Sequence, residues 1–426
     1  MIIKNFENLA SSNLRKQALL IADSGLLAIQ TERAVKRQVV YDTKKDTLII
    51  QGEHVGLNKS GRLYIVGFGK ASYDAVSTLY TILGERIACG FVVDLKGGSQ
   101  GTLTCTIGSH PFPTLVNVAA TRKIVEVMET LEERDTLLCV VSGGGSSLLC
   151  YPYNMSCELE TQIVQTLMDQ GANIEEMNTV RKHLSLVKGG QLAKAVYPAR
   201  VINLVFSDVP GDDLSMVASG PTMRDNTTVR DAQNILQKYK VLEICELASC
   251  ELKETPKEAK YFEKITSFLL VSGEHAVLAM KEKAANLGFK VVGQKIGFAG
   301  EARELAVEFL NQVQSGQCFI GSGESTVTVK VPGKGGRNLE MVLSALVNIH
   351  KGEVFLALDS DGYDNTDFAG AIADATTVEH ARRLSMEPKI HLDTNASYQF
   401  FKQVGDYIDT GLTGSNVADL VVVLKE

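Results

Sequence analysis

The sequence predicts an α/β protein of two domains: a doubly wound parallel sheet, then a second α/β domain with a mixed sheet. Three observations lead to this prediction. The chain has 426 residues, which is too long for one ordinary core. Short apolar runs alternate with helical patterns over most of its length. Many of these runs end in Gly, Ser or Asp, as parallel strands do before a crossover helix.

Four buried parallel strands are expected in the first half of the chain. They are LYIVGFG from Leu63, GFVVD to Asp94, TLLCVVSGGG from Thr136 and VINLVFSD to Asp208. Continuous apolar runs are typical of strands that helices cover on both faces, as in a Rossmann-like domain. Because ligands of such sheets bind beyond the carboxyl ends of the strands, we expect the chemistry at those ends.

The second half repeats the alternation after a charged, helix-prone stretch at residues 241–264. We interpret this stretch as a surface segment near the boundary between the two domains. The predicted domains are therefore 1–245 and 265–426. Whether they exchange segments is left open. Residues 324–331, ESTVTVKV, alternate with period two and so predict a mixed sheet in the second domain. The run DLVVVLKE predicts a last strand.

Composition and charge exclude several classes of protein. Hydrophobic residues make up 45% and charged residues 22%, as in an ordinary globular protein. The net charge of −7 gives no basic surface for nucleic acid or an anionic membrane, and no apolar run reaches the ~18 residues of a membrane span. Eight cysteines without a CxxC pair predict a reduced intracellular protein with buried thiols, and cytoplasmic is the default location. The sequence leaves open whether the protein is a monomer or a homodimer.

The first candidate motif is YIVGFGKAS, residues 64–72. A strand, two glycines and Lys70 suggest a backbone that approaches an anion closely, with a positive charge at the start of a helix. The motif is not a Walker A loop. It is also an incomplete dinucleotide fingerprint, because Ser72 holds the third glycine position. Asp94, at the end of the next strand, keeps a dinucleotide site open as an alternative.

The second motif is SGGGSS, residues 142–147. Three consecutive glycines between a buried strand and a helix leave backbone N–H groups to hold an oxyanion, and three serines add hydroxyls. The candidate binding residues are Ser142, Gly143, Gly144, Gly145, Ser146 and Ser147. A nucleophilic serine is the competing interpretation, but no GxSxG elbow is present.

Two further motifs lie before the boundary. In residues 178–193, Arg181 and Lys188 are candidate anion ligands, and a solvated helix face is the alternative. His183 in the same stretch is more often structural than catalytic. In residues 207–222, Asp208 ends a strand and Asp212 follows in a Pro-Gly turn, where carboxylates suit magnesium or a base toward a hydroxyl. Asp in such turns also commonly caps a helix.

The second half holds three more polar segments. Glu324 precedes a Gly-rich loop that contains Arg337, a residue suited to a bidentate grip on a carboxylate or phosphate. Residues 359–374 hold five aspartates, among them Asp361, at a strand end. Their spacing resembles the start of an EF-hand loop but lacks its closing Glu, so magnesium or hydroxyl binding is favoured over calcium. Asn416 lies in a last polar loop that would close over a ligand.

Taken in order, these motifs resemble those of the glycerate 2-kinase family, whose C-terminal part is called the MOFRL domain. The resemblance covers nearly the whole chain. Leu412, Thr114 and Gln191 depart from the family pattern, which favours Pro, Asp and a basic residue there. The resemblance rests on GFGKAS, GSHPFP, SGGGSSLL, NTVRKHLSLVKGG, SDVPGDDLSMVASGPT, GKGGRNLE, DSDGYDNTDFAGA and TGSNVADL.

The resemblance implies ATP and Mg²⁺ as co-substrate and cofactor, D-glycerate as acceptor and an active site in an interdomain cleft. By matching motif positions, Lys70 and Arg337 are expected to be the essential cations, and Asp208 the base or a metal ligand. The SGGGSS loop is expected to hold either nucleotide phosphates or the acceptor carboxylate. The other candidates are Asp212 and Asp361 for the metal, and Arg181, Lys188, Glu324 and Asn416 for substrate or phosphate.

Two other functions remain as alternatives at this point. An NAD(P)H-dependent hydroxypyruvate reductase would share the fold, and proteins that resemble this family have carried that label. The incomplete fingerprint and the number of phosphate-friendly loops favour the kinase. An inactive module that binds sugar acids is the third alternative, which the set of Lys, Arg and Asp side chains disfavours.

Overall fold

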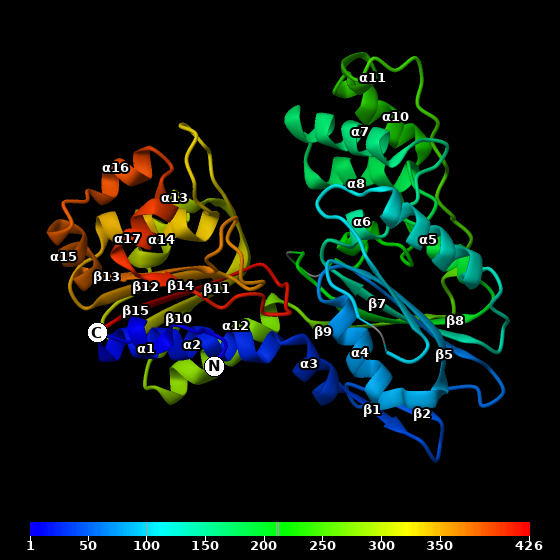
Figure 1. Ribbon diagram of the computed structural model, residues 1–426, viewed down its shortest axis with the longest axis horizontal. Helices are drawn as coiled ribbons and strands as arrows, with labels where there is room; N and C mark the ends of the chain where they lie inside the picture. The colour runs from blue at the N-terminus through cyan, green and yellow to red at the C-terminus, as the bar shows by residue number, and fades with distance from the viewer. Residues whose placement is uncertain (99, 210, 212) are drawn as a thin grey trace. The chain divides into compact units, whose positions relative to one another are not determined.

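The computed structural model describes residues 1–98, 100–209, 211 and 213–426, which form two compact units (Figure 1). The parallel-sheet unit comprises Ala34–Ser207 and Asp212–Leu270. The mixed-sheet unit comprises Met1–Arg33, Asp208–Gly211 and Val271–Glu426. No helix within the described residues is long and apolar enough to cross a bilayer.

The parallel-sheet unit is built on a six-stranded sheet of order β6-β5-β4-β7-β8-β9. All four predicted strands are present and pair in parallel with their neighbours. The strand order reverses between β4 and β7, the position at which doubly wound sheets bind ligands. The strands are β4 (Leu63–Phe68), β5 (Ile87–Asp94), β6 (Leu103–Ile107), β7 (Thr136–Ser142), β8 (Arg200–Phe206) and β9 (Ile265–Val271).

Helices and a small antiparallel sheet complete this unit. Four of the helices, α7, α8, α10 and α11, enclose a separate apolar core that includes Ile163, Val180 and Leu236. The helices are α3 (Thr31–Gln38), α4 (Ser72–Leu83), α5 (Leu115–Met128), α6 (Gly145–Leu148), α7 (Cys157–Asp169), α8 (Ile174–His183), α9 (Gln191–Val196), α10 (Val229–Lys238) and α11 (Val241–Ile244). The small sheet is β1 (Val39–Asp42), β2 (Thr47–Ile50) and β3 (Glu53–Gly56).

The mixed-sheet unit has a second six-stranded sheet, of order β10-β11-β15-β12-β13-β14. Only β10 and β11 pair in parallel, so the predicted mixed sheet is confirmed. The strands are β10 (Lys290–Glu301), β11 (Gln317–Thr326), β12 (Glu353–Asp359), β13 (Gly370–Asp374), β14 (Tyr407–Ile408) and β15 (Asp419–Lys425).

The segment that suggested a mixed sheet, residues 324–331, lies only partly in it. Strand β11 ends at Thr326, and beyond that residue Val329 and Val331 are 62% and 44% exposed. Alternation alone cannot distinguish a half-buried strand from an extended surface segment, because both repeat every two residues. The sheet is mixed because β15 runs antiparallel between β11 and β12.

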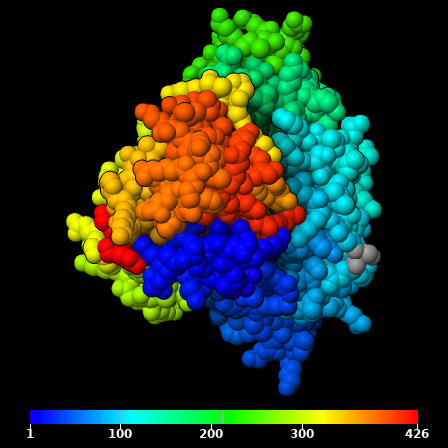
Figure 2. All heavy atoms as spheres, turned by 60° about the vertical axis from the view of Figure 1, so that its left-hand side comes forward, coloured from blue at the N-terminus to red at the C-terminus, as the bar shows by residue number. Residues whose placement is uncertain are grey.

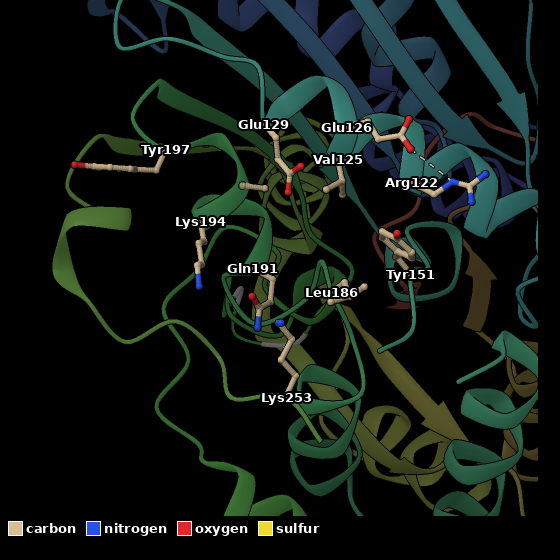
Figure 3. A pocket seen from close by; sticks show the side chains of 11 residues that line it. Arg122, Val125, Glu126, Glu129, Tyr151, Leu186, Gln191, Lys194, Tyr197 and Lys253 are labelled. Atoms are coloured by element: carbon tan, nitrogen blue, oxygen red, sulfur yellow. Dashed lines mark ion pairs between the residues drawn. The ribbon is translucent and has the colours of Figure 1, made fainter. Parts of the chain in front are cut away.

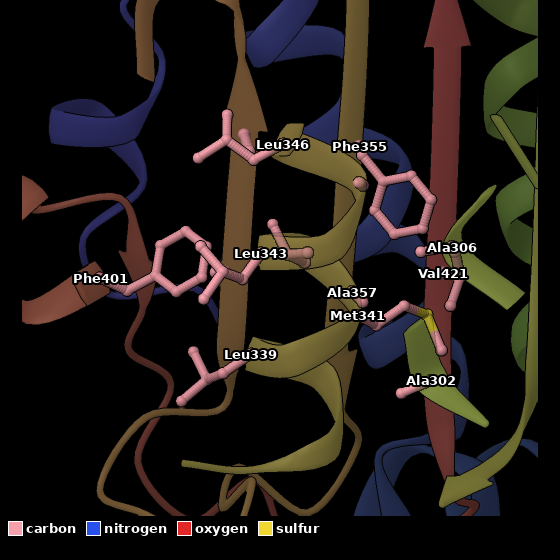
Figure 4. Packing of buried hydrophobic residues seen from close by; sticks show 14 of the residues in the cluster. Ala302, Ala306, Leu339, Met341, Leu343, Leu346, Phe355, Ala357, Phe401 and Val421 are labelled. Atoms are coloured by element: carbon pink, nitrogen blue, oxygen red, sulfur yellow. The ribbon is translucent and has the colours of Figure 1, made fainter. Parts of the chain in front are cut away.

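Helices cover both faces of the mixed sheet (Figure 1). On one face, α14 buries Leu339, Leu343 and Leu346 in a core that also contains Phe355 and Phe401 (Figure 4). That face carries α13 (Ala302–Asn311), α14 (Arg337–Asn348), α15 (Ala375–Arg383), α16 (Pro388–Asp393) and α17 (Ser397–Val404). The other carries α1 (Phe6–Leu9), α2 (Asn13–Ile29) and α12 (Gly273–Asn286).

The first 33 residues pack with the C-terminal half of the chain (Figure 2). Helix α2 lies on β12, β15 and α12. The buried guanidinium of Arg15 pairs with Asp374 at 3.1 Å and with Asp406 at 2.6 Å. Residues 1–33 therefore belong to the unit that contains the C-terminal half, whereas the predicted domain 1–245 had grouped them with the parallel sheet, apart from the predicted domain 265–426. The units also differ from the predicted domains at β9, since residues 265–270 complete the parallel sheet.

Candidate active site

Two glycine turns lie against each other where the parallel sheet reverses its strand order. Strand β4 leads into Gly69 and Lys70, and β7 leads into SGGGSS. The backbone N–H of Lys70 donates to the carbonyl of Gly143 at 2.8 Å, and the Ser142 hydroxyl donates to the carbonyl of Lys70. A Cβ on Gly69, whose φ is +110°, would lie 2.3 Å from the Ser142 carbonyl oxygen. Glycine is therefore required for this approach.

Other loops of the same unit hold the SGGGSS turn. Gly144 has a φ of +76°, and a Cβ there would lie 3.1 Å from the His110 ring. The hydroxyl of Ser147 donates to the carbonyl of Pro111 at 2.7 Å, and the hydroxyls of Ser146 and Ser219 lie 2.9 Å apart. The predicted glycines and serines are thus brought together with the loop that contains His110, which belongs to the GSHPFP motif.

Asp94, the residue that kept a dinucleotide site open, is buried and used as a helix cap. Its carboxylate accepts the backbone N–H of Tyr73 at 2.8 Å and that of Leu95 at 2.6 Å. Burial raises its pKa above the ordinary value. These contacts hold the start of α4, and a ribose hydroxyl would have to compete with two backbone donors.

The three cations of residues 178–190 have different surroundings. The ammonium of Lys188 lies 2.7 Å from Glu160, and that of Lys182 lies 3.2 Å from Asp225; all four side chains are buried. Lys188 is thus enclosed in an ion pair. Arg181 has neither an ion pair nor a side-chain hydrogen bond among the described residues.

His183 is fully buried behind this segment. Its Nδ1 lies 2.8 Å from the carbonyl oxygen of Thr179, and its Nε2 lies 3.3 Å from a carboxylate oxygen of Glu254. Both partners accept hydrogen bonds, so the ring serves to join α8 to the segment that contains Glu254. This supports the structural interpretation of His183.

Asp208 and Asn416, which are 208 residues apart, meet in the mixed-sheet unit. The amide of Asn416 donates to Asp208 Oδ2 at 2.9 Å. The Asp213 carboxylate accepts the backbone N–H of Ser215 at 2.9 Å and so stabilises a turn. Asp212, predicted as a metal ligand, lies outside the described residues.

Arg337 is the first residue of α14 and lies among three carboxylates. Its guanidinium donates to Asp419 at 2.8 Å, to Asp359 at 2.9 Å and to Glu324 at 2.9 Å. Burial alone would lower its pKa, but these carboxylates raise it overall. Burial raises the pKa of Asp359 and of Asp419. The sequence indicated Arg337 and Glu324 as site residues but assigned no role to Asp419. Its place in the TGSNVADL motif, at the start of a buried strand, is the feature that could have indicated it.

Asp361 and Asp364 belong to the acidic loop after β12. The Asp361 carboxylate accepts the backbone N–H of Tyr363 at 2.9 Å. Asp364 is 2% exposed and accepts the backbone N–H groups of Asn338 and Leu339, at 3.0 and 2.7 Å. Burial and the neighbouring Asp419 raise the pKa of Asp364 to about 7. Asp364 therefore caps the helix that begins with Arg337, a role that the sequence did not reveal.

The described residues include no group of three or more His, Cys, Asp or Glu side chains that would hold a metal ion unaided. Magnesium in kinases commonly takes one or two protein carboxylates and completes its shell with phosphate oxygens and water. Asp208 and Asp361 are the described carboxylates that the motifs indicate for the metal, and each also accepts a hydrogen bond within the protein. Asp359, Asp419 and Glu324 suit a metal less well, because each already accepts from Arg337.

A pocket of about 480 Å³ lies elsewhere in the parallel-sheet unit, between α5 and α9 (Figure 3). Its walls include Arg122, Tyr151, Gln191 and Lys253, and Arg122 pairs with Glu126 at 3.7 Å. None of the predicted site residues lines it. The candidate residues that the motifs indicate, among them those of the glycine turns and of the surroundings of Arg337, do not belong to this pocket.

The models of two protein families match the chain. Residues 17–250 match a family described as a domain of unknown function (DUF4147), and residues 317–419 match the MOFRL family. The first match spans more than half of the chain. The second covers β11, α14 with Arg337, β12 and the loop that holds Asp364.

Characterised relatives extend over nearly the full length. A D-glycerate 2-kinase of Thermotoga maritima is 34% identical, with 97% of this chain and 98% of the relative covered. A glycerate 2-kinase of Pyrococcus horikoshii is 32% identical, with 97% of each chain covered. The crystal structure of the Thermotoga maritima glycerate kinase superposes with a TM-score of 0.82, at 33% identity and with 97% of this chain and 99% of that chain covered.

The fold and the site thus define an α/β enzyme of the kinase class. The chain belongs to the glycerate 2-kinase family. A protein of Agrobacterium vitis that is provisionally named a hydroxypyruvate reductase is 35% identical over 85% of this chain.

Proposed function

We propose that this enzyme transfers the γ-phosphoryl group of ATP to the 2-hydroxyl of D-glycerate, giving 2-phosphoglycerate and ADP. The observation that carries the proposal is the contact between the Lys70 turn and the SGGGSS turn at the strand reversal of the parallel sheet. That contact brings a lysine together with a glycine-rich backbone where doubly wound sheets bind anions.

The bond changes define what the protein has to supply. The hydroxyl oxygen of glycerate forms a bond to the γ-phosphorus, the bond from that phosphorus to the bridging oxygen of ADP breaks, and the hydroxyl proton leaves. Such transfers depend on positioning and on positive charge near the phosphoryl oxygens. Asp208, held by the Asn416 amide, is the proposed acceptor of the proton or a ligand of the metal.

Arg337 and Lys70 are the proposed positive charges. A guanidinium has five N–H groups, and Arg337 directs its Nε and both Nη atoms to carboxylates. One N–H on each Nη remains for an incoming oxygen. The three carboxylates fix the plane of the guanidinium and offset its charge, so in this proposal Arg337 acts by orienting oxygens through its remaining N–H groups, and magnesium supplies the neutralising charge.

Magnesium would be held by Asp208 and Asp361 together with nucleotide oxygens, and it would neutralise charge on the phosphates. Glu324 is proposed to act through Arg337, which it contacts at 2.9 Å. Lys188 is proposed to act indirectly as well, since its ammonium is enclosed with Glu160.

The proposal is tested by mixing purified protein, ATP, magnesium and D-glycerate and measuring ADP. ADP that forms only when glycerate is present is the expected result, and phosphorus NMR of the product identifies the hydroxyl that reacts. Hydroxypyruvate with NADH is assayed in parallel, because of the name that the Agrobacterium vitis relative carries. NADH oxidation without ADP formation would replace the kinase by the reductase. The two backbone donors that occupy Asp94 count against that outcome.

A further inference from the structure

Arg181 differs from the two lysines that follow it in the sequence. Asp225 neutralises Lys182, and Glu160 neutralises Lys188. Within the described part of the chain, nothing pairs with Arg181. The side chain is partly buried, and this loss of water lowers the pKa of its guanidinium. A desolvated charge without a partner is unfavourable, so an external anion is the expected partner.

Glu160 is the acidic group whose charge acts on Arg181, but its contacts lie elsewhere. One of its carboxylate oxygens accepts from the Lys188 ammonium at 2.7 Å. The other accepts from the thiol of Cys150 at 3.3 Å. The carboxylate is therefore engaged by two neighbours, and neither oxygen bonds to the Arg181 guanidinium.

The position of Arg181 on α8 links it to the SGGGSS turn. Asn178 lies three residues earlier and so on the same side of the helix. The Asn178 amide oxygen accepts from the Ser219 hydroxyl at 2.7 Å, and that hydroxyl lies 2.9 Å from the Ser146 hydroxyl. Arg181 therefore follows, one helical turn later, the Asn178 side chain that is bonded to this row of polar groups.

The backbone around Ser219 is held in an unusual conformation. Ala218 and Ser219 have φ values of +52° and +59°, in the left-handed region that residues with a Cβ rarely adopt. The Ser219 hydroxyl is fully buried and bonded at both sides. Strain of this kind persists where the surrounding structure requires it, and it occurs often at ligand sites.

From these contacts we infer that Arg181 binds the carboxylate of the hydroxy acid acceptor. The acid, rather than the nucleotide, then lies at the end of the SGGGSS turn where Ser146 contacts Ser219. This inference rests on the proposed function and assigns one of its substrates to a subsite. A planar guanidinium fork matches a carboxylate with two parallel hydrogen bonds. The half-buried Ser146 hydroxyl suits a hydroxyl group of the acid, and the buried Ser219 and Asn178 side chains hold it in place.

The count of charges favours the acid over the nucleotide. A triphosphate carries three to four negative charges and needs several cations near it. Among residues 178–193, Lys182 and Lys188 are already neutralised by Asp225 and Glu160, which leaves the charge of Arg181. Lys70 belongs to the other turn, where the proposed function places the phosphoryl group. One guanidinium balances one carboxylate.

The test replaces Arg181 by Met, which keeps much of the side-chain volume and removes the charge. We expect KM for D-glycerate to rise roughly ten- to hundredfold, the usual effect of losing a charged hydrogen bond, with KM for ATP changed less than about twofold. Arg181→Lys should give an intermediate KM, since it keeps the charge and loses the fork. Arg230→Met, at an exposed position on α10, is the matched control and should leave both constants unchanged.

A second measurement uses the neutral amide of glycerate as a competitor. The unaltered enzyme should prefer D-glycerate over this amide strongly, and Arg181→Met should lose most of that preference. A rise in KM for ATP alone would assign Arg181 to the nucleotide and overturn the inference. Unchanged constants in a folded Arg181→Met variant would overturn it as well.

Failure of the proposed function gives a different result. If the unaltered enzyme forms no ADP with D-glycerate, the acceptor is wrong, and calorimetric titration of D-glycerate alone then tests the subsite without turnover. Binding that Arg181→Met abolishes and Arg230→Met retains would keep the carboxylate subsite. If D-glycerate does not bind to the unaltered enzyme, the carboxylate subsite is ruled out. Circular dichroism and the melting temperature of each variant show whether it is folded.

Discussion

The Asp364 carboxylate accepts the backbone N–H of Leu339 at 2.7 Å, across 25 residues of sequence. Its other oxygen accepts the N–H of Asn338. These two bonds occupy donors that the first turn of α14 leaves unpaired. Because Arg337 immediately precedes Asn338, the cap also fixes the backbone from which the guanidinium extends. A Cβ on Gly336 would lie 1.9 Å from the Asp364 carbonyl oxygen, so the chain passes tightly here.

Replacing Asp364 by Asn should change how stability depends on pH. The pKa of Asp364 is about 7 in the folded protein and close to 3.8 when unfolded. The folded state therefore binds the proton more tightly, and this contribution is fully present below about pH 4 and lost as pH rises to about 7. Its size is on the order of 4 kcal/mol.

Urea unfolding at a series of pH values measures this effect. Between pH 4 and 7, the free energy of unfolding should fall more steeply for the unaltered protein than for Asp364→Asn. Carboxylates remote from Asp364 are shared by the two proteins and cancel in the difference, whereas the neighbouring Asp419 contributes to it. Parallel curves would show that Asp364 ionises normally.

Lys70→Ala should lower turnover at least about a hundredfold, the usual cost of losing a charge contact in the transition state. The melting temperature should change little, because the backbone of residue 70 still donates to Gly143. Lys59→Ala, at an exposed position of the same unit, is the control and should keep full turnover. Turnover near that of the unaltered enzyme would remove Lys70 from the proposed mechanism.

Arg337→Ala should lower turnover to a similar degree and should also destabilise the protein. Without the guanidinium, Asp359 and Asp419 remain buried with no cation beside them, which typically costs about 3–5 kcal/mol. Denaturant unfolding measures the loss of stability, and steady-state kinetics on the folded fraction measures the loss of turnover. An unchanged unfolding midpoint would mean that these carboxylates are protonated or solvated without Arg337.

Gly69→Ala should disturb the contact between the two glycine turns. The new Cβ would meet the Ser142 carbonyl oxygen at 2.3 Å, so one turn has to move. Gly52→Ala is a matched control, because its φ is also positive, +85°, and nothing lies within 4 Å of the added Cβ. Both variants carry a conformational strain of about 1–3 kcal/mol. Only Gly69→Ala should also lose most of its turnover, as measured by ADP release.

Arg15→Ala should unfold the mixed-sheet unit at lower denaturant. The substitution leaves Asp374 and Asp406 without their cation, and we expect a loss of about 3–5 kcal/mol. Lys16→Ala, at the neighbouring exposed position, should be within about 0.5 kcal/mol of the unaltered protein. Equal midpoints for the two variants would contradict the role of Arg15 in joining residues 1–33 to the second sheet.

Strand ends and glycine turns could be predicted from the sequence because their signals are local. An apolar run and three glycines identify β7 and its turn without reference to other residues. The partners of Arg337 could not be predicted, since Asp419 lies 82 residues away and comes near only through the pairing of β15 with β12. The alternation of residues 324–331 led to the correct prediction of a mixed sheet, but the end of the strand at Thr326 could not be predicted, because it depends on neighbouring strands.

The cations of residues 178–193 illustrate the same limit within one motif. Arg181 and Lys188 had equal weight as candidate ligands, because each is a basic residue near a helix end. Glu160, which pairs with Lys188, lies 28 residues earlier and on another helix. Only packing distinguishes an enclosed charge from one that is left for a ligand.

The placement of residues 1–33 has a consequence for how the chain is made. Helix α2 (Asn13–Ile29) leaves the ribosome well before β12 (Glu353–Asp359) and β15 (Asp419–Lys425), the strands that cover its apolar side. At ordinary rates of translation this delay is on the order of half a minute. During that interval the apolar side of α2 has no native partner, so the nascent chain has to be kept from aggregating until its final strand arrives.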